Sequence, residues 1–149
     1  MGSAVHAASL ERPVKLMIAL EMIGYYDSAP GSQDYPYPAM SWLYPDRGDF
    51  IAVVGRMQDI NAVRQVKATL LSSRYLSVYS MNAPGFIPGI DFSDHLNYWQ
   101  HDIPAVMITD TAFYRNKQYH LPGDTADRLN YQKMAQVVDG VINLLYNSK

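Results

Sequence analysis

The chain has 149 residues, of which 48% are hydrophobic and 17% charged, a balance typical of one globular domain with a sizeable core. Its net charge of −2 offers no electrostatic footprint for nucleic acid, and no apolar run approaches the roughly 20 residues of a membrane span. It has no cysteine, so disulfides and thiolate metal sites are excluded, and a metal would need His, Asp or Glu ligands. The amino-terminal residues show no export-signal pattern, so we expect a soluble protein, cytoplasmic by default.

The alternation of apolar runs with Gly and Pro predicts four strands and four helices along the chain. The strands are expected at residues 14–20, 50–54, 76–81 and 104–109. The helices are expected at residues 2–12, 60–73, 93–100 and 131–145. This order predicts a single domain over residues 1–149 of the layered α/β class, in which helices flank a twisted, mostly parallel sheet of about four strands.

Two of these helices carry caps and apolar faces in their sequence. Asp59 is a candidate N-cap for the helix at residues 60–73, and Asn130 is one for the last helix. The last helix has an apolar stripe that we expect to face the core: Tyr131, Met134, Val137, Val138, Val141, Ile142 and Leu145.

Two long loops could carry function. The aromatic residues of the loop at residues 25–49 either line a pocket or pack the loop onto its own body: Tyr35, Tyr37, Trp42 and Tyr44. The second loop, at residues 110–127, is polar and follows a short buried strand. In α/β sheets the loops beyond the carboxyl ends of strands carry the chemistry, so this loop predicts one wall of an active site.

A metal site is the chemistry that the residue types favour. Zinc accepts imidazole nitrogen and carboxylate oxygen. Glu21 directly follows the first strand, and His120 lies in the loop after the last strand, so both can reach one rim of the sheet. Asp94 and Asp124 are candidates for further ligands or for acceptors that fix an imidazole. From its position alone, Glu21 is either a loop carboxylate that has reached solvent or a functional group.

Other chemistries have less support. A serine triad of Ser93, His120 and an aspartate lacks the G-x-S-x-G turn that exposes such a serine. A carboxylate pair for glycoside hydrolysis has no supporting spacing, and phosphate loops and dinucleotide fingerprints are absent from the sequence.

Five segments carry a resemblance to a known family: LEMIGYY (20–26), YPDRGDFIAVVG (44–55), FSDHLNYW (92–99), PAVMITDTAFYRN (104–116) and YHLPGDTADRLNY (119–131). From about Gly2 to Leu145, the chain resembles the C-terminal half of co-catalytic zinc aminopeptidases of the bacterial leucyl type, to which glutaminyl cyclases are related. The resemblance implies that Glu21 is an acidic zinc ligand and that His120 is the last histidine ligand.

The same resemblance implies supporting roles for other residues. Asp94 matches an acidic residue that supports the site, and Tyr114 and Tyr119 would line the substrate pocket near the zinc. His95 would be structural. No catalytic residue is assigned, because the His-x-Asp motif, the bridging aspartate and the Glu-Glu pair of the family do not occur in this sequence.

We therefore expect a zinc-dependent, aminopeptidase-like peptide hydrolase, or a fragment or complementing half of one, that binds zinc weakly and hydrolyses peptides poorly alone. The alternative is a non-catalytic remnant of the same fold that associates with itself. A weaker alternative is a glutaminyl-cyclase-like acyl transfer. Because missing strands would leave an edge or a face of the sheet uncovered, we expect a homodimer or higher oligomer, or pairing with a missing N-terminal half.

Overall fold

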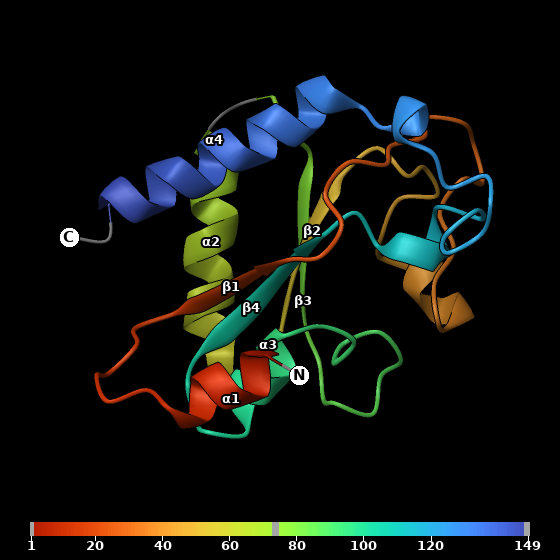
Figure 1. Cartoon of the computed structure of the whole chain (residues 1–149). Coiled ribbons are helices and arrows are strands. Elements are labelled where there is room, and N and C mark those ends of the chain that lie inside the picture. Colours follow the sequence, from red (N-terminus) through yellow and green to blue (C-terminus); the bar gives the residue numbers. More distant parts are fainter. Residues whose placement is uncertain (1, 73–74, 148–149) are drawn as a thin grey trace.

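A four-stranded sheet forms the centre of the computed structural model, which describes residues 2–72 and 75–147 (Figure 1). Its strands are β1 (Met17–Leu20), β2 (Ile51–Gly55), β3 (Val78–Asn82) and β4 (Ala105–Thr109). They lie in the order β1-β4-β2-β3. β1 pairs with β4, and β2 with β3, in parallel, whereas β2 and β4 are antiparallel. The expected layered α/β fold with a mostly parallel sheet is confirmed.

Helices cover both faces of this sheet. Because successive side chains of a strand point to opposite faces, Ile51 and Val53 of β2 belong to one core, and Ala52 and Val54 belong to another. The first core lies under α2 (Ile60–Ser72) and α4 (Tyr131–Asn147). The second core lies under α1 (Gly2–Ala8) and α3 (His95–Trp99). No helix within residues 2–72 and 75–147 has both the length and the apolar character needed to cross a bilayer.

Several element boundaries differ from the sequence-based expectation. β1 begins at Met17 rather than at residue 14, because its neighbour β4 begins only at Ala105, directly opposite Met17. α1 ends at Ala8, well before the proline that was expected to stop it. α2 ends at Ser72, and the expected last residue, Ser73, lies outside the described residues.

The caps and the stripe of the helices are partly as expected. Asn130 does cap α4, since its side-chain oxygen accepts the Lys133 N–H at 3.0 Å. Asp59 instead lies in a short 3-10 turn before α2 and pairs with Arg56. The α4 stripe is rotated from the expected one: the buried residues are Val137, Gly140 and Leu144. Four positions that were expected in the core are exposed, because α4 turns the side of Gly140 towards Leu70 of α2: Tyr131, Val138, Ile142 and Leu145.

The sheet brings the functional loops to one rim. Since β1 and β4 are parallel, the chain leaves both strands at the same end of the sheet. The Glu21 N–H still donates to the Ile108 carbonyl of β4 at 3.0 Å. β2 is antiparallel to β4, so the long loop at residues 25–49 enters the sheet at this same end. One bridge, between Asp27 and Gly48, closes that loop at its base. Residues 21–50 form one connection from β1 to β2, and this connection and the loop after β4 therefore meet at one end of the sheet (Figure 1).

The two-faced core predicts where truncation is costly. Ile51 of β2 is fully buried, whereas Ile142 of α4 is 42% exposed. We expect Ile51→Ala to lower the free energy of unfolding by about 2–5 kcal/mol, because the sheet cannot collapse into the resulting cavity. The matched variant Ile142→Ala should cost less than about 1 kcal/mol. Urea unfolding followed by circular dichroism measures both, and equal losses would contradict this assignment of the core.

Candidate functional site

Glu21 lies at the rim, directly after β1, and is half-buried. One of its carboxylate oxygens, Oε2, accepts a hydrogen bond from the Ser93 hydroxyl at 3.0 Å. The neighbouring Asp94, expected to support the site, is exposed and instead accepts a hydrogen bond from Ser3 of α1 at 2.6 Å. Ser93 is thus the residue of the Ser-Asp-His segment that touches Glu21, a role that the sequence reasoning did not consider.

His120 lies on the exposed outer part of the loop after β4. Its backbone is left-handed, with φ of 58°, and its ring stacks on that of Tyr119 with centroids 3.9 Å apart. Asp124 orders this turn through the backbone: one carboxylate oxygen accepts the His120 N–H at 3.3 Å, and the other accepts the Asn116 side-chain amide at 2.8 Å. The imidazole itself is left open to solvent at the surface.

Tyr119 links the two candidate ligands. Burial raises the pKa of its hydroxyl, and the negative charges of Glu21 and Asp124 raise it further. Tyr119 and Glu21 also line the same cavity. Glu21 and Tyr119, the residue before His120, thus border the same cavity, whereas His120 itself is not among the residues that line it.

The donor types at this rim fit zinc, but the set is incomplete. Among residues 2–72 and 75–147, no group of three or more His, Asp or Glu side chains is arranged to hold a metal ion. A catalytic zinc takes three protein ligands and keeps one position open. Glu21 and His120 could therefore provide only part of such a coordination shell.

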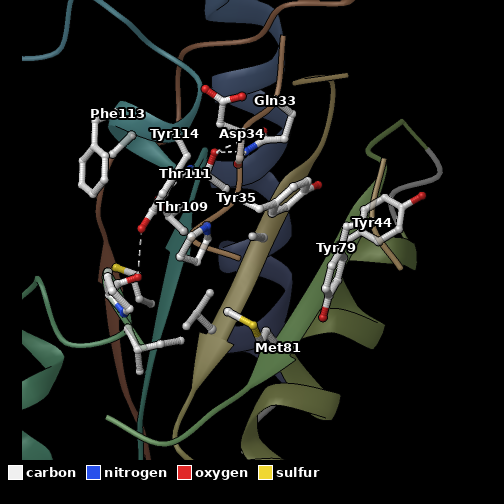
Figure 2. A pocket seen from close by; sticks show the side chains of 18 of the residues that line it. Gln33, Asp34, Tyr35, Tyr44, Tyr79, Met81, Thr109, Thr111, Phe113 and Tyr114 are labelled. Carbon is white, nitrogen blue, oxygen red and sulfur yellow. Dashed lines mark hydrogen bonds between the residues drawn. The ribbon is translucent and has the colours of Figure 1, made fainter. Parts of the chain in front are cut away.

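A cavity of about 110 Å³ opens beside Glu21 (Figure 2). Aromatic and sulfur-containing side chains from the β1–β2 connection, from β3 and from the loop after β4 form much of its wall: Tyr35, Tyr44, Tyr79, Met81, Phe113 and Tyr114. Two of the loop aromatics that the sequence left undecided, Tyr35 and Tyr44, line it, whereas Trp42 points to solvent. Tyr114 and Tyr119, expected from the resemblance, are among the lining residues. The β3 residues were missed because their strand read only as core.

Arg115 fixes the base of this cavity from inside the protein. Its guanidinium is buried over the Phe50 ring, 4.6 Å from the centroid. Nε donates to Gln33 at 2.9 Å, and Nη1 donates to the carbonyl oxygens of Tyr25 and Phe50 at 3.0 Å each. One side chain therefore ties the loop after β4 to two points of the β1–β2 connection and to the residue before β2.

Asp110, the first residue after β4, is a second buried polar centre. Oδ2 accepts the N–H groups of Gly24 at 3.0 Å and Tyr25 at 2.8 Å, and Oδ1 accepts the Ala112 N–H at 3.0 Å. The Asp110 N–H donates to the Met22 carbonyl at 2.7 Å. Burial raises the pKa of this carboxyl group, and its backbone hydrogen bonds and Arg115 oppose that rise. Sequence reasoning assigned Asp110 no role, although its place at a strand end was visible.

His95, the last residue of the Ser-Asp-His segment, is structural as expected. It is fully buried, its Nε2 lies 2.6 Å from the Ile90 carbonyl, and its ring meets Trp99 edge-on. Burial lowers the pKa of its imidazole. The side chain holds α3 against the loop that contains Ile90, on the wall of the cavity.

Comparison with known proteins agrees with this geometry. The family model of Peptidase family M28 matches residues 1–145. The whole chain is 95% identical to an Escherichia coli (strain K12) protein described as uncharacterized protein YfbL, and it spans 46% of that protein's length. The chain thus covers about half of the curated relative that it matches.

Two solved structures show the same fold. The Legionella pneumophila LapA aminopeptidase superposes with a TM-score of 0.67 at 21% identity, over 96% of this chain and 34% of that protein. BSAP, a zinc aminopeptidase from Bacillus subtilis, superposes with a TM-score of 0.63 at 15% identity, over 99% of this chain and 32% of that protein. At such identities the likeness establishes the fold alone.

The buried imidazole of His95 predicts a pH dependence of stability. Its pKa is lowered on folding, so the unfolded chain binds a proton that the folded chain excludes as the pH falls below about 6.5. The free energy of unfolding should fall with it, down to the folded pKa. In urea titrations between pH 7.5 and 5.5, His95→Gln should lose part of this dependence, whereas the exposed control His101→Gln should keep it. Identical pH profiles for wild type and His95→Gln would contradict the assignment.

Proposed function

The chain belongs to peptidase family M28, and on that premise we propose that it forms one half of the active site of an aminopeptidase-like, zinc-dependent peptide hydrolase. One observation carries the proposal: Glu21 and Tyr119, the residue before His120, line the same apolar cavity, beyond the carboxyl ends of two parallel strands. Ligands bind at this end of an α/β sheet. The proposed metal ligands are Glu21 and His120.

Supporting residues have separate proposed tasks. Asp124 fixes the backbone of the His120 turn, and Ser93 donates to one oxygen of Glu21, leaving the other oxygen for a cation. Asp94 acts at longer range, by holding the segment of Ser93 against Ser3 of α1. Tyr114 and Tyr119 contact the substrate at the cavity mouth, where a peptide's first side chain would enter.

The chemistry needs more than this chain provides. Zinc bound at such a site lowers the pKa of a bound water and polarises the scissile carbonyl, while a glutamate moves the proton. The chain's own residues would bind one side of the metal, orient the substrate and exclude water from the cavity. The remaining ligands and the base would come from the part of the longer relative that this chain does not span.

The metal ligands are tested by zinc titration of the chain. We expect weak binding by isothermal titration calorimetry, and we expect Glu21→Gln and His120→Ala each to weaken it about tenfold or more, because each removes one of two protein ligands. His101→Ala is the control, since His101 is also exposed but lies at the other end of β4. Unchanged binding in both ligand variants would refute the proposed site.

The second candidate function is a non-catalytic remnant of the same fold. It is favoured by one observation: no group of three candidate metal ligands occurs among the described residues. Activity tests separate it from the hydrolase. The chain alone should release little p-nitroaniline from leucyl-p-nitroanilide. Co-expression with the remaining part of the longer relative should raise the rate by about 10²-fold or more, because a base and ligands are restored. Failure of the complemented complex to hydrolyse the substrate while holding zinc would favour the remnant.

We also propose that the chain associates with itself when it is alone. β1 is an edge strand of the described sheet, and its last residue, Leu20, is 45% exposed. Unpaired edges of this kind template pairing with another chain. In size-exclusion chromatography with light scattering, we expect twice the 16.8 kDa of one chain.

A charge on that edge should prevent the association. Leu20→Lys is expected to give a monomer, because a lysine on an edge strand opposes pairing. The control Leu43→Lys, in the long loop and also exposed, should leave the dimer intact. A wild-type monomer at micromolar concentration would refute self-association.

A further inference from the structure

We infer that Asp110 is a positioning residue that sets the direction of the Glu21 carboxylate by holding the turn that follows it. This rests on the proposed role of Glu21 as a metal ligand. Asp110 itself faces the backbone of that turn and not the cavity that Glu21 lines.

The turn after Glu21 is bonded to Asp110 at three points. The Met22 carbonyl accepts the Asp110 N–H, and the N–H groups of Gly24 and Tyr25 both donate to Oδ2. On its other side, Glu21 is held in register by its own N–H bond to Ile108. Glu21 is therefore fixed between two residues of the β4 segment that are only two positions apart.

The Glu21 side chain depends on this backbone for its direction. Its carboxylate has one described side-chain partner, the Ser93 hydroxyl at 3.0 Å. A single neutral donor does not fix a flexible side chain, so the direction of the Cα–Cβ bond matters. That direction is set by the backbone at Leu20 to Met22, which Asp110 fixes.

Backbone strain at these same positions supports the inference. Three non-glycine residues beside Asp110 have positive φ: Met22 at 20°, Thr111 at 74° and Ala112 at 52°. Such conformations are costly for residues other than glycine and persist only where the surroundings determine them fully. The hydrogen bonds of Asp110 involve Met22 and Ala112 directly. The carboxylate thus maintains a strained turn next to the proposed ligand.

A carboxylate suits this task better than other side chains. It accepts three backbone N–H bonds at once, two through Oδ2 and one through Oδ1. An asparagine has one acceptor oxygen, and its NH₂ group would face a backbone N–H. Asp110→Asn therefore keeps the size of the side chain but replaces one acceptor oxygen, so the backbone N–H bonds to that oxygen are lost.

Asp59 offers a matched control at the other end of the same strand. It is also a buried aspartate, 6% exposed against 2% for Asp110, and it lies near the N–H of Ala105, where β4 begins. Asp59→Asn should cost stability in the same way while leaving the Glu21 turn untouched.

The experiment measures zinc affinity and amide hydrogen exchange for the 149-residue chain and its variants. For Asp110→Asn we expect zinc affinity to fall about 10–100-fold, the usual effect of losing a residue that orients a ligand. Exchange should accelerate at Gly24, Tyr25 and Ala112. Asp59→Asn should bind zinc as wild type does. Because Asp110 acts through Glu21, the double variant Glu21→Gln/Asp110→Asn should bind no more weakly than Glu21→Gln alone.

Three results would overturn the inference: wild-type zinc affinity in Asp110→Asn, an equal loss in Asp59→Asn, or additive losses in the double variant. If Glu21→Gln alone leaves zinc affinity unchanged, the proposed function itself fails, and the inference fails with it. Asp110→Glu keeps the charge but moves the carboxylate by one methylene. If Asp110→Asn does not fold, a weakened zinc affinity in Asp110→Glu supports the inference, and an unchanged affinity refutes it.

Discussion

One buried carboxylate determines how the functional end of this molecule is arranged. Asp110 directly follows β4. Its carboxylate accepts hydrogen bonds from backbone N–H groups of its own loop and of the loop after β1. Placing a charge in the interior is costly unless it is fully hydrogen-bonded. Here the cost is offset by three donors and by the nearby positive charge of Arg115. Without the Asp110 carboxylate, the hydrogen bonds that hold Gly24 and Tyr25 against the end of β4 would be lost.

Arg115 extends the same arrangement to the cavity. Its bonds to Gln33, Tyr25 and Phe50 join the long loop to the strand that the loop enters. Gly48 is required beside it, because a Cβ there would lie 2.5 Å from the Arg115 side chain. The aromatic walls of the cavity are therefore held by a polar centre beneath them, not only by their own contacts.

Sequence reasoning predicted the layers and the strands, because short apolar runs and a period of 3.6 residues report burial. It missed what depends on tertiary contact. The buried side of α4 is set by Gly140 against Leu70, so Ile142 and Leu145, apolar in the pattern, face outwards. Asp110 and Ser93 were misjudged for a related reason: a lone polar residue acquires its role from partners that only folding brings near.

Hydrogen bonds at this end of the sheet order the loops of the proposed ligands, although the described residues provide only part of a metal site. Asp110 and Ser93 hydrogen-bond the Glu21 segment, and Asp124 accepts the His120 N–H. The backbone on which the two proposed ligands lie is thus held by side chains of this chain. A partner segment would have to bring ligands and a base, but would not have to order these loops. The loops at this end of the sheet are already ordered by hydrogen bonds within the chain. Binding of another segment there therefore loses less conformational entropy than binding that is coupled to the folding of these loops.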